Sequence, residues 1–279
     1  MSGRIDLHVH TTASDGQQSP AEVVQAALSL GLAAIAITDH DSTEGVEPAM
    51  EAARGTTLLV IPGVEISTET ARSEVHVLGY HIAYRDPCLC SKLALFRQAR
   101  LHRAQEMAAK LTRMGLPVAL EEVQEMAGGA AVGRPHVAMV MLQKGYVSSV
   151  DEAFNLYIGR NGPAYAERLK LSAVEAVQTV LDAGGLPVLA HPLRVTHLLP
   201  ELISSGLAGL EVYYPGYAAE ETELLLDLAA KYGLIVTGGS DYHGPDVLPG
   251  NVLGGVPVPL SALQALQAHE RRPSVCAGS

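Results

Sequence analysis

The segment RIDLHVHTTASDG, residues 4–16, decides how this chain is interpreted. It places His8 and His10 two positions apart among residues typical of a β-strand, and Asp15 follows in a polar loop. Side chains two residues apart in a strand point to the same side. The segment therefore brings two imidazoles to one point, which predicts half of a metal site.

Short apolar runs elsewhere predict further strands. They are rich in Val, Ile and Leu and do not alternate with polar residues, which is typical of strands covered on both faces, as in parallel sheets. Helical segments between them carry start signals, including the capping boxes Ser19–Glu22 and Ser172–Glu175. This alternation predicts an α/β fold, either a (β/α) barrel or a doubly wound sheet. The expected strands after the first span residues 33–38, 58–66, 75–81, 186–191, 209–214 and 234–243.

One region interrupts the alternation of strands and helices. A long helix is expected over 91–115, and three shorter helical patterns follow it up to Gly159. Because strands resume afterwards, we interpret 91–159 as an all-helical insertion that forms part of a substrate pocket. Residues 1–90 and 160–279 are then expected to form the metal-binding barrel.

Composition limits the possible partners and compartment. The formal net charge of −11 argues against nonspecific binding to duplex DNA or to an anionic membrane. No apolar run reaches the roughly 18 residues of a membrane span, and no signal peptide is visible. The small, odd number of three cysteines fits a reducing compartment, so we expect a cytoplasmic protein, and we interpret Cys88 and Cys90 as ordinary thiols. The basic stretch 92–113 is either a solvated helix face or a wall that attracts anions.

The ends of the expected strands collect histidines and carboxylates. In barrels, the loops after the strands form the active-site face. Imidazole combined with carboxylate suits zinc, manganese or iron. Nine ligands exceed the needs of one ion, so we expect two or three neighbouring ions with a bridging carboxylate. The predicted ligands are His8, His10, Asp15, His40, Glu65, His76, His191, Asp241 and His243. Asp6 and Asp39 are expected to orient ligating imidazoles.

Six motifs also carry a family resemblance: DLHVHTTASDG, ITDHDS, PGVEI, HVLGY, AHP and GSDYH. Together they resemble the polymerase and histidinol phosphatase (PHP) family. The resemblance implies a distorted seven-stranded (β/α) barrel, a centre of three divalent ions, manganese foremost, and hydrolysis of phosphoesters. It also implies the ligand sets: His8, His10, Glu65 and Asp241 for one ion, Glu65, His76 and His191 for the second, and Asp15, His40 and His243 for the third.

Two shorter motifs refine the resemblance. GRPHVA at 133–138 and AHPLR at 190–194 resemble a subgroup with a helical insertion, which contains nucleoside 3′,5′-bisphosphate phosphatases and 5′-to-3′ exoribonucleases. A guanidinium fork matches a phosphate, so arginines beside these motifs are candidates for substrate binding. The expected substrate-binding residues are Arg134, Arg194, His136, Arg103 and Arg160. His197 is the expected donor of a proton to the leaving oxygen, and Asp15 and His40 are expected to take part in catalysis.

The sequence therefore predicts a metal-dependent phosphatase that acts on nucleoside 3′,5′-bisphosphates, and more slowly on 5′-mononucleotides such as AMP. One alternative is a 5′-to-3′ exoribonuclease acting on short 5′-phosphorylated RNA. An alternative of another class is a noncatalytic metal-binding module, which the intact ligand set disfavours. The ester position, the base, the native ion and the oligomeric state are left open.

Overall fold

Seven strands form one sheet in the order β1-β2-β3-β4-β5-β6-β7. The computed structural model describes residues 3–70, 73–128, 132–167, 171–245, 247 and 250–268. The expected mixed α/β architecture is confirmed, and each strand predicted from its apolar run is present, although the last, expected over 234–243, ends at Gly238. The strands are β1 (Arg4–Val9), β2 (Leu32–Ile37), β3 (Leu59–Glu69), β4 (Glu74–Tyr80), β5 (Leu186–Leu189), β6 (Gly209–Tyr213) and β7 (Ile235–Gly238).

Strand β4 differs from the expected parallel sheet. It pairs antiparallel with both β3 and β5, whereas the other neighbours pair parallel. A strand that runs backwards places its first residues at the edge where its neighbours end. His76, near the start of β4, therefore lies opposite Ser67 of β3, at the edge that gathers the other predicted ligands.

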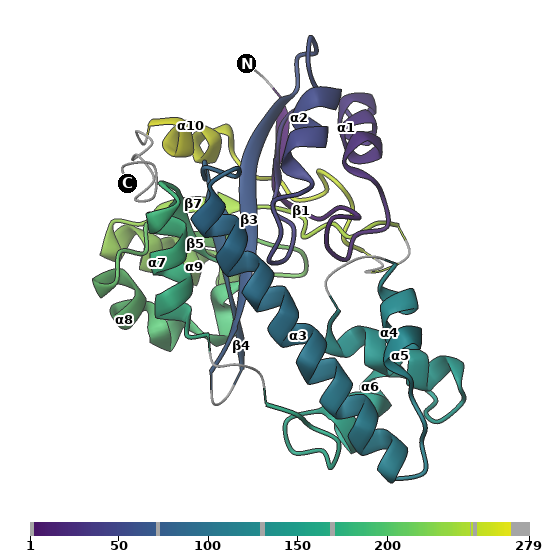
Figure 1. The fold of residues 1–279 in the computed structure, drawn as a ribbon. Coiled ribbons are helices and arrows are strands. Elements are labelled where there is room, and N and C mark those ends of the chain that lie inside the picture. Colours follow the sequence, from purple (N-terminus) through teal and green to yellow (C-terminus); the bar gives the residue numbers. More distant parts are fainter. Residues whose placement is uncertain are drawn as a thin grey trace. The chain divides into compact units, whose positions relative to one another are not determined.

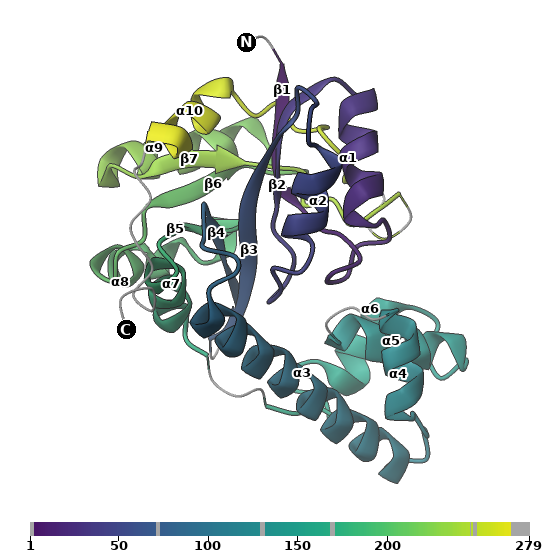
Figure 2. The same ribbon diagram turned by 45° about the horizontal axis from the view of Figure 1, so that its top comes forward.

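The chain divides into two units, Met1–Lys92 with Leu171–Ser279, and Leu93–Lys170. In the first unit, α1 packs against β2, α2 packs against β3, and these two helices lie side by side (Figure 1). Helix α7 packs on β4 and β5, while α9 and α10 cover β6 and β7 (Figure 2). The helices are α1 (Pro20–Ser29), α2 (Val46–Ala52), α7 (Ala173–Asp182), α8 (Leu199–Ser204), α9 (Ala219–Tyr232) and α10 (Leu260–Ala268), with short 3₁₀ turns at η2 (Pro192–Arg194) and η3 (Thr196–Leu198).

Both predicted capping boxes are confirmed. The Ser19 hydroxyl accepts a hydrogen bond from the Glu22 backbone amide, and the Glu22 side chain accepts one from the Ser19 amide in return. Ser172 and Glu175 repeat the arrangement at the start of α7. Each box satisfies amide groups that the first helical turn leaves without partners.

The second unit has its own apolar core. It is built on α3 (Pro87–Arg113), which begins in the first unit, and its fully buried centre includes Met107, Val137 and Met141. Arg103 is 7% exposed, donates from Nε to the carbonyl of Ala166 and lies over the Tyr165 ring. The described part of this unit is therefore packed as a helical body. Its other helices are α4 (Leu120–Ala127), α5 (Arg134–Gln143), α6 (Val150–Ala153) and the π-helix η1 (Phe154–Ile158).

The structure bears on two expectations drawn from composition, those on membrane-spanning segments and on the cysteines. Among the described residues, no helix has both the length and the apolar character needed to cross a membrane. Cys90 is a free, exposed thiol, which agrees with its interpretation as an ordinary thiol.

Candidate metal centre

The side chains predicted as metal ligands come from six of the seven strands or from the loops that follow them. His8 lies in β1 and His10 directly after it, while Glu65 lies in the middle of β3 rather than at its end. The remaining ligands are Asp15 in the loop after β1, His40 after β2, His76 in β4, His191 after β5, and Asp241 and His243 after β7.

The first cluster is fully buried and combines residues 8, 10, 65 and 241. The Nε2 atoms of His8 and His10 lie 3.3 and 3.2 Å from Glu65 Oε2. The same two nitrogens lie 3.3 and 3.1 Å from Asp241 Oδ1. Two imidazole nitrogens and two carboxylate oxygens thus converge from three strands, in the grouping that the resemblance implies for the first ion.

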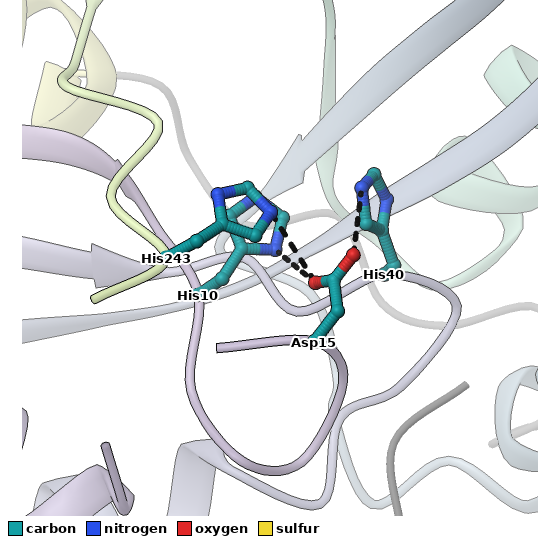
Figure 3. A group of neighbouring side chains, drawn as sticks. All are labelled: His10, Asp15, His40 and His243. Carbon is teal, nitrogen blue, oxygen red and sulfur yellow. Dashed lines mark ion pairs between the residues drawn. The ribbon is translucent and has the colours of Figure 1, made fainter. Parts of the chain in front are cut away.

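The second cluster is centred on Asp15 (Figure 3). Asp15 Oδ1 lies 3.3 Å from His243 Nε2 and 3.5 Å from His10 Nδ1, and Oδ2 lies 3.8 Å from His40 Nε2. This group contains the implied ligands of the third ion, with His10 in addition. The His10 imidazole therefore faces the first cluster with one nitrogen and the second cluster with the other.

The third cluster shares Glu65 with the first and contains residues 40, 65 and 76. Glu65 Oε1 lies 2.9 Å from His76 Nδ1 and 3.2 Å from His191 Nε2, while Oε2 lies 3.0 Å from His40 Nδ1. His40 takes the place that the implied second set gives to His191, which still contacts Glu65. One carboxylate therefore touches five of the six histidines, the pattern of a bridging ligand.

Three buried atoms test whether cations fit this centre. His8 Nε2, His10 Nε2 and Glu65 Oε2 are shielded from solvent and have no hydrogen-bond partner. Leaving buried polar groups unsatisfied is costly. Imidazole nitrogens and carboxylate oxygens are ligands for zinc, manganese and iron. Divalent ions therefore fit the donor set and would satisfy the orphaned atoms.

Without metal, the close packing of imidazoles and carboxylates shifts the pKa values of these groups. Burial would lower the pKa of His10, but the Asp241, Glu65 and Asp15 carboxylates raise it to about 10. Burial would raise the pKa of those three carboxylates, yet the imidazoles hold each one well below its usual range. Burial and the neighbouring His10 and His76 lower the pKa of His40 to about 3. Protons thus balance part of the negative charge when no metal does.

The backbone at two predicted ligands is strained. His191 has φ 29° and Asp241 has φ 51°, a left-handed region that residues other than glycine seldom adopt. Such strain concentrates at functional sites, where the surrounding structure holds it. Gly239, two residues before Asp241, packs so closely that a Cβ atom there would overlap the backbone nitrogen of His8. The loop after β7 is therefore built to approach β1.

Asp6 and Asp39 were expected to orient imidazoles, but among the described residues neither carboxylate has a hydrogen bond to an imidazole ring. Asp6 accepts hydrogen bonds from the amides of Ser240 and Gly254 and from the Ser240 hydroxyl. Asp39 accepts from the amide and hydroxyl of Thr11 and from the Ser14 hydroxyl. Both carboxylates fix the loops that carry ligands rather than the ligand rings.

Several residues that touch the ligands were missed by the sequence analysis. The Ser14 hydroxyl contacts Asp15, and the Ser67 hydroxyl contacts the His40 ring. Glu211 in β6 contacts the His8 ring, and the Tyr214 hydroxyl donates to Asp241 Oδ2. The available signal for Glu211 was its position as the one charged residue in the buried run GLEVYY. A carboxylate in such a strand needs a buried partner.

The predicted substrate-binding residues fall in both units. In the second unit, Arg134 is the first residue of α5 and its guanidinium lies over the Phe154 ring. His136 Nδ1 accepts a hydrogen bond from the Gly133 amide, which caps the same helix. Arg103 is buried as described above, and Arg160 is half-buried.

The first unit holds the other two candidates. Arg194 ends η2 and His197 lies in η3, and both side chains are exposed. Arg194 and His197 follow His191 by three and six residues, so both lie in the short turns directly after a predicted metal ligand.

Comparison with known proteins identifies the family. The model of the PHP domain matches residues 6–159. The chain belongs to the PHP family. This confirms the resemblance carried by the six motifs, and PHP domains are distorted barrels.

Relatives of known name cover most of the chain. The 5′-3′ exoribonuclease Rnm of Escherichia coli is 35% identical over 86% of this chain and 85% of its own length. The 3′,5′-nucleoside bisphosphate phosphatase of Chromobacterium violaceum is 31% identical over 86% of this chain and 87% of its own length. A crystal structure from Bifidobacterium adolescentis, classed provisionally as a metal-dependent phosphoesterase, has a TM-score of 0.83 at 32% identity, and the match covers 95% of this chain and 96% of that one. The expected class of enzyme, a phosphoesterase, is therefore confirmed by its relatives.

Proposed function

We propose that this protein is a metal-dependent phosphatase that removes a phosphate from nucleoside 3′,5′-bisphosphates. The observation that carries the proposal is the convergence of imidazole nitrogens on both oxygens of buried Glu65. The relative from C. violaceum supports the choice of substrate. 5′-Mononucleotides such as AMP would be hydrolysed more slowly, because they offer one anion instead of two.

Three divalent ions, manganese foremost, would be held by the three clusters. Such ions neutralise the charge on an attacked phosphoryl group and lower the pKa of a water molecule near it. Glu65 would join the clusters, because its oxygens face different histidines. His10 would contribute one nitrogen on each side, and Asp15 and His40 would stand closest to the reacting phosphate among the chain's own groups.

Recognition of the second phosphate would fall to arginine. Arg194, which follows the ligand His191 along η2, carries an exposed guanidinium whose fork matches a phosphate. Arg134 of the helical unit is the second candidate, and Arg103, Arg160 and His136 of the same unit are further candidates. His197, exposed in η3, would donate a proton to the leaving oxygen.

A 5′-to-3′ exoribonuclease is the second candidate function. The relative from E. coli favours it. The 5′ end of an RNA also presents two anions, its terminal phosphate and the first internucleotide phosphate. A site that holds one anion by arginine and cleaves at the other suits both substrates.

We also infer that the sheet closes into the distorted barrel expected from the family. The support is the segment after β7, where Tyr242 forms a parallel bridge with Val9. The His10 amide donates to the Tyr242 carbonyl at 2.9 Å. Closure would bring the ligands of the first and last strands together.

A panel of substrates tests the proposal. Manganese-loaded protein is assayed for product release from a nucleoside 3′,5′-bisphosphate, a 5′-mononucleotide, histidinol phosphate and a short 5′-phosphorylated RNA. The proposal expects the highest kcat/KM with the bisphosphate. A higher value with RNA would establish the exoribonuclease, and no turnover of any ester would leave a metal-binding module.

A further inference from the structure

Strand β6 supplies none of the predicted metal ligands, although it lies between β5 and β7, which lead into three of them. It nevertheless carries a carboxylate, Glu211, that is 0% exposed. A buried charge is retained only where it is paired or hydrogen-bonded. The contacts of Glu211 therefore show what this strand does.

Both oxygens of Glu211 are engaged with residues of the metal centre. Oε1 lies 2.8 Å from Nδ1 of His8, and Oε2 accepts a hydrogen bond of 2.7 Å from the backbone amide of His191. His8 belongs to β1 and His191 follows β5, so one side chain connects two distant strands. The contact at Nδ1 leaves Nε2 of His8 for the cluster with Glu65 and Asp241.

We propose that Glu211 is a positioning residue of the metal centre, which holds the His8 ring with Nε2 toward the ions and holds His191 in its strained backbone conformation. A carboxylate that accepts a hydrogen bond from one imidazole nitrogen selects the tautomer whose other nitrogen can bind a metal. The amide contact stabilises His191 at φ 29° and ψ 58°, which few residues adopt unaided.

Tyr214, directly after β6, extends the same role to a third ligand. Its hydroxyl donates to Oδ2 of Asp241 at 2.8 Å, while Oδ1 of Asp241 faces His8 and His10. The register of β6 against β7 shifts between Glu211 and Tyr213. An irregularity of this kind redirects side chains beside an active site. The strand without ligands thereby orients those of its neighbours.

The test measures metal binding by variants of the full chain. In Glu211→Gln the amide oxygen can still accept from His8, but the amide nitrogen then faces the donating His191 nitrogen. We expect the affinity for Zn²⁺ or Mn²⁺, added alone and followed by calorimetry, to fall by about 10- to 100-fold. In zinc-loaded protein, the ¹⁵N chemical shift of His8 Nδ1 should differ between wild type and variant, because the partner of the Nδ1 proton changes from a carboxylate to an amide.

Thr237→Val is the matched control. Thr237 lies opposite Glu211 in the β6–β7 ladder and is equally buried, but it contacts no predicted ligand in the described residues. Its metal affinity should equal that of the wild type. If Glu211→Gln binds metal as tightly as the wild type, or if both variants lose affinity equally, Glu211 does not position the ligands.

Tyr214→Phe decides the matter if Glu211→Gln does not fold. It removes one hydroxyl and leaves the ring, and we expect a loss of metal affinity of at least several-fold. Unchanged affinity would overturn the role of β6. The inference rests on the metal centre of the proposed function and holds whichever ester is cleaved. If the wild type binds no metal, the metal centre itself is refuted. If the wild type binds metal and the variants bind it equally well, only this inference is refuted.

Discussion

Nε2 of His8 lies 3.3 Å from Oε2 of Glu65, and both atoms are buried without a hydrogen-bond partner. A nitrogen and an oxygen that face each other without forming a hydrogen bond leave the lone pairs of both atoms unsatisfied. A cation that both atoms can coordinate removes this cost. This pair of atoms is therefore the clearest indication that the centre requires a cation.

Glu65→Gln should therefore remove metal and activity together. The substitution keeps the side-chain shape but replaces the carboxylate that faces five histidines. We expect wild-type protein to carry two to three divalent ions per chain by elemental analysis, and the variant to carry fewer. Glu74→Gln, at the exposed start of β4, is the control and should keep its full metal content. A metal-free variant with wild-type turnover would contradict the metal centre.

Metal binding should release protons and strengthen as the pH rises. The pKa of His10 is raised to about 10 in the chain by itself, so at neutral pH this imidazole carries a proton that an entering ion must displace. Below a pH of about 10, raising the pH therefore increases the affinity for the ion, because fewer His10 imidazoles carry the competing proton. Calorimetric titration with Zn²⁺ in buffers of different ionisation enthalpy measures the number released. Affinity that does not change between pH 6 and pH 8 would be incompatible with this expectation.

Arg134→Ala should affect nucleotide substrates more than small ones. If the helical unit selects the substrate, the loss of one guanidinium raises KM for a nucleoside bisphosphate and leaves turnover of a small aryl phosphate nearly unchanged. Steady-state kinetics on both substrates measure the difference. Arg113→Ala, at the exposed end of α3, provides the control. Equal damage to both substrates would assign Arg134 to the chemistry or to the fold.

Arg194→Ala should reduce the preference for two phosphates. Loss of one partner of a charged contact lowers kcat/KM by roughly 10- to 1,000-fold. We expect that decrease for the bisphosphate and little change for the monophosphate, so that the two values approach each other. If the wild type already hydrolyses both with equal efficiency, no second anion site exists and the arginine has another role.

The ligand positions were predictable from the sequence for a physical reason. His8 and His10 share one side of a strand at any register, because side chains alternate with a period of two. Asp241 and His243 instead lie in the loop after β7, where the backbone of Asp241 is left-handed, so they were located by the apolar run that precedes them and not by strand periodicity. The local sequence pattern was therefore sufficient to predict where the strands lie and which side chains gather at their ends.

Strand direction and the supporting contacts were not predictable in the same way. An apolar run has the same composition whichever way it points, so the reversal of β4, and with it the approach of His76 to Glu65, had no local signal. The contacts of Glu211 cross from β6 to β1 and β5, and they depend on a sheet that only the folded chain provides. The buried position of Arg103 likewise depends on the packing of Tyr165 and Ala166.

The backbone bridge between Val9 and Tyr242 joins the first strand to the segment after the last one. A ribosome makes β1 first, so His8 and His10 leave it long before Asp241 and His243 exist. Contacts between such distant residues form slowly, because a long loop must close before they stabilise anything. If the centre binds metal as proposed, its complete ligand set would form late in biosynthesis, and a chain whose translation stops before β7 would lack Asp241 and His243. Bound ions would then distinguish finished from unfinished molecules.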